Sequence, residues 1–176
     1  TTQNCEIDES EARLGGVTIQ LFDAANHLVA TTTTAADGSY RFDNLRAGTY
    51  HVHEIQPTAY FDGCTHTGSL GGDDTVNDDI TSIVTVSGDH GINYNFGEIP
   101  PGEISGYVFR DGAPIASANG QIPANLYDLR DGKLTADDQR IGGVTLELRY
   151  TLTGEPVRGE DLLPGTYPAG PVRTVT

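Results

Sequence analysis

Carboxylates are the side chains of this sequence whose number points most directly to a chemistry. The 176 residues include 25 Asp and Glu but only 10 Lys and Arg, which gives a formal net charge of −15. Clustered carboxylates attract divalent cations, calcium above all, because hard cations prefer several oxygen ligands. The alternative is a solvated acidic surface that only keeps the protein soluble. Because such a chain repels phosphate backbones, the composition argues against nucleic acid as a partner.

A long polar stretch, residues 60–79, concentrates several acidic and amide side chains. It is too long for a simple hairpin loop, so we predict a loop that covers one end of the fold. Such a loop could bind calcium or form an interface, and a disordered, solvated loop is the alternative. The residues concerned are Asp73, Asp74, Asn77, Asp78 and Asp79.

The two cysteines, Cys5 and Cys64, point to a disulfide rather than to metal chemistry. Neither belongs to a C-x-x-C pair, which is the spacing of zinc and thioredoxin-type sites. A disulfide in an oxidising compartment is the natural hypothesis, and two unpaired buried thiols are the alternative. Closing a loop of about 60 residues would stabilise the fold by about 4 kcal/mol in the chain-entropy model.

Catalytic and membrane-spanning signatures are absent from the sequence. It contains no G-x-S-x-G elbow, no H-E-x-x-H helix and no glycine-rich phosphate loop. It also contains no run of eighteen apolar residues, so we predict no membrane span. These absences favour a structural or binding role over an enzymatic one.

The elements that must position the acidic groups are indicated by a stretch that occurs twice. Residues 14–21 read LGGVTIQL and residues 141–148 read IGGVTLEL. The return of one pattern predicts a repeated structural unit. Val17, Ile19 and Leu21 alternate with polar residues, a period of two that places them on one face of a β-strand. The glycine pair in front permits a turn or a bulge where the chain enters that strand.

Further apolar alternations, separated by turn residues, predict an all-β sandwich protein with two modules. In the first module we predict extended segments over residues 28–34, 39–43, 50–55, 80–86 and 92–96. Pro100 and Pro101 then form a stiff linker, because each proline fixes one backbone angle. Residues 104–109 are expected to be the first strand of a second module, and no clear strand is predicted after Tyr150. The two modules therefore span residues 1–99 and 100–176.

Several motifs in this order resemble one known family. They are LGGVTIQL (14–21), ADGSYRF (36–42), LRAGTYHV (45–52), EIQP (54–57), GINYNFG (91–97) and ISGYVF (104–109). The set is similar to the SdrD B-like family of the wider Cna B-type, or prealbumin-like, sandwiches of bacterial surface proteins. The resemblance implies a Greek-key β-sandwich, with one nearly complete module and the beginning of a second. It also implies a secreted or bacterial cell-surface location in a tandem array.

Calcium ligands are implied by the same resemblance, because related modules often carry a loop of the form D-x-[DN]-x-[DN]-G before the repeated strand. In the second module Asp131 and Gly132 keep the fifth and sixth positions, and Asp138 stands at the distal acidic position. Tyr127 and Leu129 replace the first two ligands, so the loop is degenerate. The candidate ligands are Asp128, Asp131, Asp137 and Asp138 in the second module and Asp8, Glu9 and Glu11 in the first.

A strand like residues 104–109 precedes the acidic loop in related modules, and the first module has none before Asp8. The resemblance therefore implies that this strand is missing here, either cut away or supplied by another chain. Residues 104–109 could themselves be donated to a neighbouring chain by strand addition.

Together these features predict a non-enzymatic structural or adhesive repeat module of a secreted or cell-surface protein, stabilised by calcium. The expected partners are neighbouring repeat modules or identical chains. One alternative is a carbohydrate- or protein-binding module of a secreted multidomain protein, with a glycan or a surface protein as its ligand. The other is a filament subunit assembled by strand donation.

Overall fold

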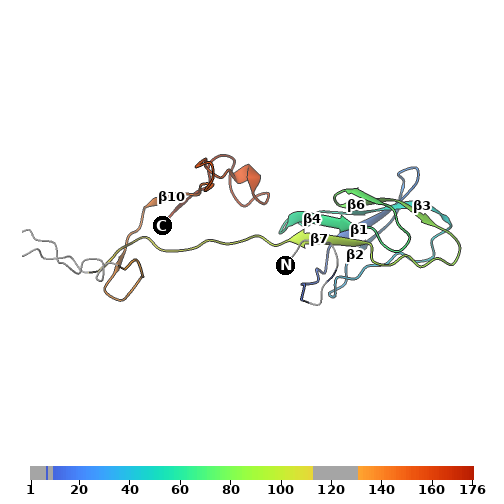
Figure 1. Cartoon of the computed structure of the whole chain (residues 1–176), viewed down its shortest axis with the longest axis horizontal. Coiled ribbons are helices and arrows are strands. Elements are labelled where there is room, and N and C mark those ends of the chain that lie inside the picture. The colour runs from blue at the N-terminus through green and yellow to red at the C-terminus, as the bar shows by residue number, and fades with distance from the viewer. Residues whose placement is uncertain (1–6, 8–9, 113–130) are drawn as a thin grey trace, which may run out of the picture. The chain divides into compact units, whose positions relative to one another are not determined.

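The computed structural model describes residue 7 and residues 10–112 and 131–176. The chain falls into two compact units, Thr1–Pro101 (unit 1) and Gly102–Thr176 (unit 2) (Figure 1). Within the described residues the regular structure is antiparallel β-strand, apart from the 3-10 turn η2 (Gly159–Asp161) in unit 2. The predicted all-β class is therefore confirmed.

Unit 1 is built on a five-stranded sheet with the strand order β2-β1-β3-β6-β5. The strands are β1 (Thr18–Asp23), β2 (Leu28–Thr33), β3 (Gly48–Glu54), β5 (Asp73–Val76) and β6 (Asp79–Thr85). The sequence alternation places Ile19 and Leu21 of β1 on the same face as Val52 of β3, since Leu21 pairs with Val52 across the ladder. This shared face is the inner side of the sheet.

A second sheet of two strands, β4 (Phe61–His66) and β7 (Asn95–Ile99), completes the sandwich. The core consists of apolar side chains that are less than one-tenth exposed, and partly buried aromatic rings pack against them. The core residues are Val17, Ile19, Leu21, Val52, Ile80 and Ile83, and the rings are Tyr40, Phe42, Tyr50, Tyr94 and Phe96.

Several predicted boundaries in unit 1 need correction. The stretch 60–79 is not a single loop, because it contains β4 and β5. Strand β4 is polar and was missed for that reason, yet it is held by its ladder with β7. Residues 39–43 form no ladder, although Tyr40 and Phe42 turn inward as predicted. The last strand of the unit covers residues 95–99 rather than 92–96.

The duplicated Gly-Gly sequence forms the same corner in both units. Gly16 and Gly143 have positive φ angles of 84° and 76°, which glycine adopts without a steric penalty. The amide of Gly16 donates to Thr34 O at 2.8 Å, and the amide of Gly143 donates to Thr176 O at 2.7 Å. The Thr34 and Thr176 hydroxyls accept from the following valine amides, at 3.0 and 3.2 Å. Thr176 is thus the counterpart of Thr34.

Unit 2 contains two short ladders, β8 (Phe109–Arg110) with β9 (Gln139–Arg140) and β10 (Thr145–Glu147) with β11 (Arg173–Val175). The expectation of no strand after Tyr150 is wrong, because β11 pairs with β10 as β2 pairs with β1. The strand was not recognised because 25 residues separate Glu147 from Arg173, whereas a four-residue turn joins β1 and β2. Val157 and Val172 are the buried apolar residues of this unit within the described part.

Candidate functional site

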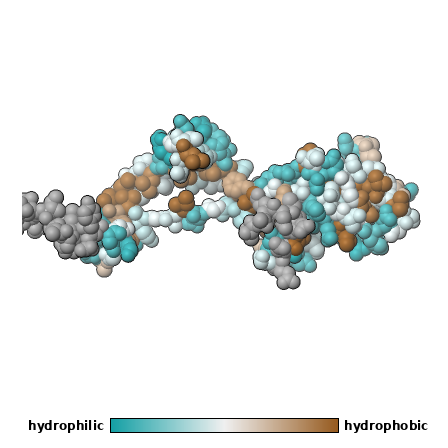
Figure 2. All heavy atoms as spheres, viewed as in Figure 1, coloured by the Kyte–Doolittle hydropathy of each residue, from teal (hydrophilic) through white to brown (hydrophobic). Residues whose placement is uncertain are grey.

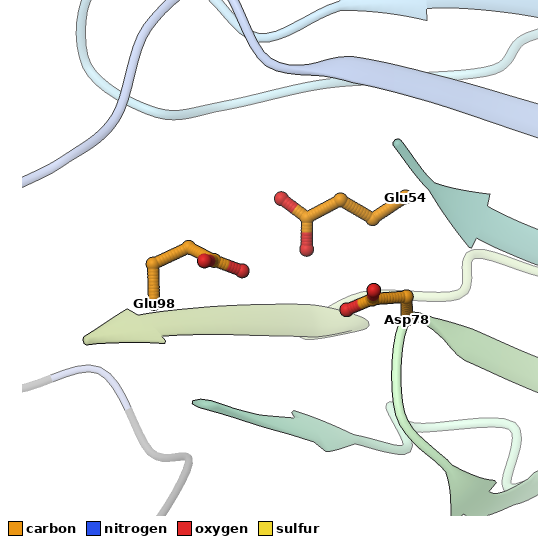
Figure 3. Close-up of side chains that lie close together, drawn as sticks. All are labelled: Glu54, Asp78 and Glu98. Carbon is orange, nitrogen blue, oxygen red and sulfur yellow. The ribbon is translucent and has the colours of Figure 1, made fainter. Parts of the chain in front are cut away.

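Three acidic side chains converge inside unit 1, from three separate parts of the fold. They are Glu54 at the end of β3, Asp78 in the turn between β5 and β6, and Glu98 on β7, and their carboxyl groups point toward one another (Figure 3). One carboxylate oxygen of each residue lies within 4.8 Å of the other two. We call these three residues the carboxylate cluster.

Glu54 is placed inside the sandwich by strand parity. Val52 faces the core, so the side chain two residues further along β3 faces the same way. Glu54 pairs with Ile19 across the ladder and is only 3% exposed. A charged residue at such a position is rare unless a partner compensates its burial.

Asp78 and Glu98 reach the cluster by different routes. Asp78 occupies the left-handed region, with φ of 62°, and its carbonyl oxygen accepts the Glu54 amide at 2.8 Å. Asp and Asn enter that region more readily than most residues, so the turn suits this sequence. Glu98 lies two residues after Phe96, which packs on the core, and therefore shares its inward face.

The hydrogen bonding of the cluster is incomplete. Glu98 Oε2 accepts a hydrogen bond from Gln56 Nε2 at 2.6 Å. Glu54 Oε2 and Glu98 Oε1 are buried and have no hydrogen-bond partner within the described residues, and the same is true of Gln56 Oε1. Each buried polar atom left in this state costs about 1–3 kcal/mol, and more when it is charged. The site therefore has three oxygens whose burial the fold itself does not compensate.

The pKa values of the three carboxyl groups reflect the same unfavourable burial. Burial, followed by the charges of Glu98, Asp78 and Asp62, raises the pKa of Glu54 from 4.5 to about 8. Burial also raises the pKa of Glu98 to about 6, although its hydrogen bond from Gln56 opposes the shift. The pKa of Asp78 is raised as well, by burial first and then by Asp62. The three carboxyl groups therefore disfavour one another's negative charge, and within the described residues none of them forms an ion pair with Lys or Arg.

These residues fit a hard divalent cation. All three offer carboxylate oxygens, the ligand type that calcium prefers, at about 2.3–2.6 Å from the ion. Oxygens on opposite sides of such an ion would be about 4.8 Å apart, so one ion can contact all three residues. Within the described part of the chain, this is the one group of three or more His, Cys, Asp or Glu side chains that are close enough to share an ion.

A cavity of about 540 Å³ adjoins the cluster. Glu54 and Glu98 contribute to its wall together with Tyr40, Tyr94 and Phe96. Another part of the wall comes from the segment that leads into the Gly-Gly corner, including Glu11, Arg13 and Leu14. The cluster is therefore reached from this cavity and is not sealed in the core.

The residues of the predicted acidic loop separate into one cluster member and four others. Asp78 joins the cluster, whereas the Asp73 and Asp74 carboxylates accept hydrogen bonds from the amides of Thr75 and Thr67, at 3.0 and 2.9 Å. Asn77 donates to Asp62 Oδ2 at 3.1 Å. Asp79 Oδ1 lies 3.3 Å from His53 Nδ1. The structure thus places these residues on the β5–β6 hairpin.

The candidate ligands of the second module accept hydrogen bonds from nearby loop residues. Asp138 accepts bonds from the amides of Gly112 and Thr135, and Asp131 accepts one from the Lys133 amide. Asp137 accepts a bond from the Thr135 hydroxyl at 2.6 Å. Asp8, Glu9 and Asp128 lie outside the described residues, so calcium binding by this set stays a prediction.

Cys64 lies on β4 and is not a free thiol. Cys5 lies outside the described residues. The Cys5–Cys64 disulfide therefore stays a prediction.

Sequence reasoning missed Glu54 and Glu98 as site residues. Glu54 lies near the end of the predicted strand 50–55, and Glu98 lies beyond the predicted strand 92–96, yet the period of two already gave the direction of both side chains. Tyr50, Val52 and Glu54 fall on one face, as do Tyr94, Phe96 and Glu98. The signal was present in each strand separately, but their meeting depends on the pairing of distant segments.

The two-sheet arrangement of unit 1 and the ordered sequence motifs place the chain in the class of antiparallel β-sandwich domains. The SdrD B-like domain family matches residues 1–96, more than half of the chain, and the chain belongs to this family.

Among curated proteins, the chain is similar to serine-aspartate repeat-containing protein D of Staphylococcus aureus (strain Newman). The two are 27% identical over 149 residues, which is 85% of this chain and 10% of that protein. It is also similar to serine-aspartate repeat-containing protein F of Staphylococcus epidermidis (strain ATCC 12228 / FDA PCI 1200), with 32% identity over 93 residues. That match covers 51% of this chain and 6% of the relative. The chain thus spans about a tenth or less of the length of these relatives.

No solved structure gave a significant match. Within the described residues, no helix is long and apolar enough to cross a membrane.

Proposed function

We propose that this chain is a pair of tandem SdrD B-like modules with a non-enzymatic, structural role in a secreted or bacterial cell-surface protein. The observation that carries the proposal is the corner that occurs once in each consecutive unit, with matching glycine angles and matching threonine hydrogen bonds. Serial units of one design suit a protein that spaces or connects larger parts. Similarity to two serine-aspartate repeat-containing proteins supports this assignment.

Calcium stabilises the modules in this proposal. The support is the excess of 25 acidic over 10 basic residues and the oxygen-rich cluster inside unit 1. Thermal unfolding of the whole chain in calcium and in EDTA tests the idea, because a ligand that binds only the folded state raises its melting temperature. We expect a lower melting temperature in EDTA. Equal melting temperatures in the two buffers would contradict a role for the metal.

A disulfide between Cys5 and Cys64 is the second proposed stabilising device. Its support is that Cys64 is not a free thiol and that the sequence contains one other cysteine. Thiol titration of the denatured chain without reductant should find no free thiol, and reduction should release two. Two reactive thiols before reduction would contradict the disulfide.

Filament formation by strand donation is a second candidate, and the cavity favours it. Ala12 and Arg13 line the cavity together with residues of β7. The corresponding residues of the repeat in unit 2, Gln139 and Arg140, pair with β8. Within the described residues β7 pairs only with β4, so its second edge is available to an added strand. The predicted strand 104–109 pairs only at Phe109, where β8 begins, and Ile104 in its unpaired part is 89% exposed.

Sedimentation over a dilution series tests this second candidate. Strand donation through residues 104–109 predicts oligomers that dissociate on dilution and that Ile104→Asp abolishes. Leu152→Asp is the matched control, because Leu152 is 99% exposed and lies outside the donated segment. A wild-type chain that remains monomeric at every concentration would exclude strand donation.

A further inference from the structure

We infer that unit 1 binds a divalent cation between its two sheets, with Glu54, Asp78 and Glu98 as ligands. The ion would join β3 of the large sheet, β7 of the small sheet and the turn between β5 and β6. The inference rests on the calcium-stabilised module proposed above and assigns the ion to residues other than the acidic loops that precede the repeated strands. It makes the metal an internal crosslink.

The first argument is the convergence of the three residues. They come from positions 54, 78 and 98 of the chain and from three elements, yet one oxygen of each lies within 4.8 Å of the others (Figure 3). Like charges repel, so the fold gains nothing from this arrangement by itself. A cation in the centre turns the same arrangement into an attraction.

The second argument is independent of the clustering and concerns unsatisfied buried atoms. Glu54 is only 3% exposed and its side chain is directed into the cluster (Figure 3). Its Oε2 atom has no hydrogen-bond partner in the part of the chain that the structure describes. Glu98 Oε1 is also buried without a partner. Native proteins satisfy nearly all buried polar atoms, so two orphaned carboxylate oxygens at one point call for a ligand.

The third argument identifies the kind of cation. The cluster offers oxygen atoms only, without a thiolate or an imidazole, which favours calcium or magnesium over zinc or copper. Calcium accepts six to eight oxygen ligands in flexible geometry, whereas magnesium demands a near-ideal octahedron at about 2.1 Å, so three carboxylates from separate elements favour calcium. Gln56 brings a further buried oxygen without a partner next to Glu98. The adjoining cavity of about 540 Å³ gives the ion and its remaining water ligands access to the site.

Calcium titration of the whole chain by calorimetry, combined with melting curves, tests the inference. The test variants are Glu54→Gln, Glu98→Gln and Asp78→Asn, each of which removes one charge while it keeps the size of the side chain. The double variant Asp131→Asn/Asp138→Asn is the control, because it alters the predicted loop ligands of unit 2. Asp78→Asn is the safest for folding, since Asn accepts the left-handed angle as readily as Asp.

We expect each cluster variant to lose about tenfold or more in calcium affinity at one site, together with the calcium-dependent rise in melting temperature. In EDTA at neutral pH the melting temperature of Glu54→Gln should exceed that of the wild type, because a neutral amide replaces a carboxyl group that must take up a proton to be buried. The control variant should keep both the affinity and the rise.

The possible failures are distinguishable. If the loop variant loses the calcium response while all three cluster variants keep it, the metal lies in the loop. The structural proposal then survives and this inference does not. If the wild type binds no divalent cation and only Glu54→Gln changes the melting temperature, the cluster is balanced by protons, and both the inference and the calcium role are wrong.

Discussion

The two units contain the same corner but bury it differently. In unit 1 the side chains after the glycine pair, Ile19 and Leu21, are 1% and 2% exposed, whereas Leu146 and Leu148 in unit 2 are 44% and 40% exposed. Figure 2 shows hydrophobic surface along the part of unit 2 that holds β10. The corner depends only on nearby residues, because the backbone angles of the glycines and the hydrogen bonds of one threonine define it. Burial requires further strands, and β3 and β6 provide them in unit 1.

The carboxylates of the two units differ in the same way. Residues 1–101 contain 15 acidic and three basic side chains, and residues 102–176 contain 10 and seven. In unit 2 Glu147 is bonded to Arg173 and Arg149, and the hydrogen bond from Arg173 is the main cause that lowers the pKa of Glu147. In unit 1 Glu54 has no such partner among the described residues, and its pKa rises to about 8. Glu147 is therefore balanced by two arginines, whereas the burial of Glu54 is not balanced by an ion pair within the described residues.

The largest expected effect comes from matched truncations in the repeated strand. Ile19→Ala removes a fully buried side chain from the core and should lower the free energy of unfolding by about 2–5 kcal/mol. Leu146→Ala, at the corresponding position of unit 2, should change it by less than about 0.5 kcal/mol, because the side chain is already hydrated. Denaturant unfolding monitored by circular dichroism measures both. A large loss from Leu146→Ala would show that unit 2 buries this face.

The response to pH should have opposite signs in the two units when calcium is chelated. Between pH 4.5 and about 8 the folded chain keeps a proton on Glu54 that the unfolded chain has released. The melting temperature of unit 1 should therefore fall as pH rises through this range. The negative charges of Glu98, Asp78 and Asp62 raise the pKa of Glu54 further and so add to this loss of stability.

Glu160 in unit 2 provides the contrast. Its hydrogen bond from the Gly170 amide, together with Arg158, lowers its pKa to about 2. Its stabilising contribution is complete above pH 4.5 and is lost as pH falls toward 2. Melting curves in EDTA test the first response, with Glu54→Gln as the control that should remove it. Carboxyl NMR titration of Glu160 tests the second, and a midpoint near 4.5 would contradict it.

The sequence predicted those parts of the fold in which the residue pattern of a single segment determines its local structure. The alternation of Val17, Ile19 and Leu21 identified β1 and its inner face, and the Gly-Gly pair identified the corner. The polar strand β4 lacks such a pattern and exists because β7 pairs with it. Strand β11 was missed for a related reason, since its partner lies 25 residues away across an insertion.

The carboxylate cluster could be predicted only in part. Asp78 was recognised as a member of an acidic stretch, but its neighbours in sequence do not accompany it into the cluster. The inward direction of Glu54 and Glu98 follows from Val52 and Phe96 by strand parity. No single segment indicates that these side chains meet, because the meeting depends on how the two sheets stack. Their strained burial became visible only when all three elements were in place.

A smaller difference in stability is expected between alanine substitutions at the first glycine of each corner. A Cβ atom on Gly15 would lie 2.8 Å from Ala35 O, whereas one on Gly142 would lie 3.7 Å from Thr176 O. Gly15→Ala must therefore displace backbone and should cost about 1–3 kcal/mol, the range for overpacking. Gly142→Ala should be close to neutral. Equal losses in the two variants would mean that the backbone next to the corner is packed alike in both units.

The smallest effect should be shared by the second glycine of each corner. Gly16 and Gly143 both have positive φ, and a Cβ atom on either would meet nothing within 4 Å. The penalty of Gly16→Ala and of Gly143→Ala is therefore conformational alone, about 1 kcal/mol in each unit. Hydrogen exchange of the Thr34 and Thr176 amides, which donate to Val17 O and Val144 O, reports the local opening of each corner separately. Acceleration at Thr34 by Gly16→Ala should match the acceleration at Thr176 by Gly143→Ala. If the two differ widely, the corner of unit 2 is held by more than its own residues, and its likeness to unit 1 is one of sequence rather than of energy.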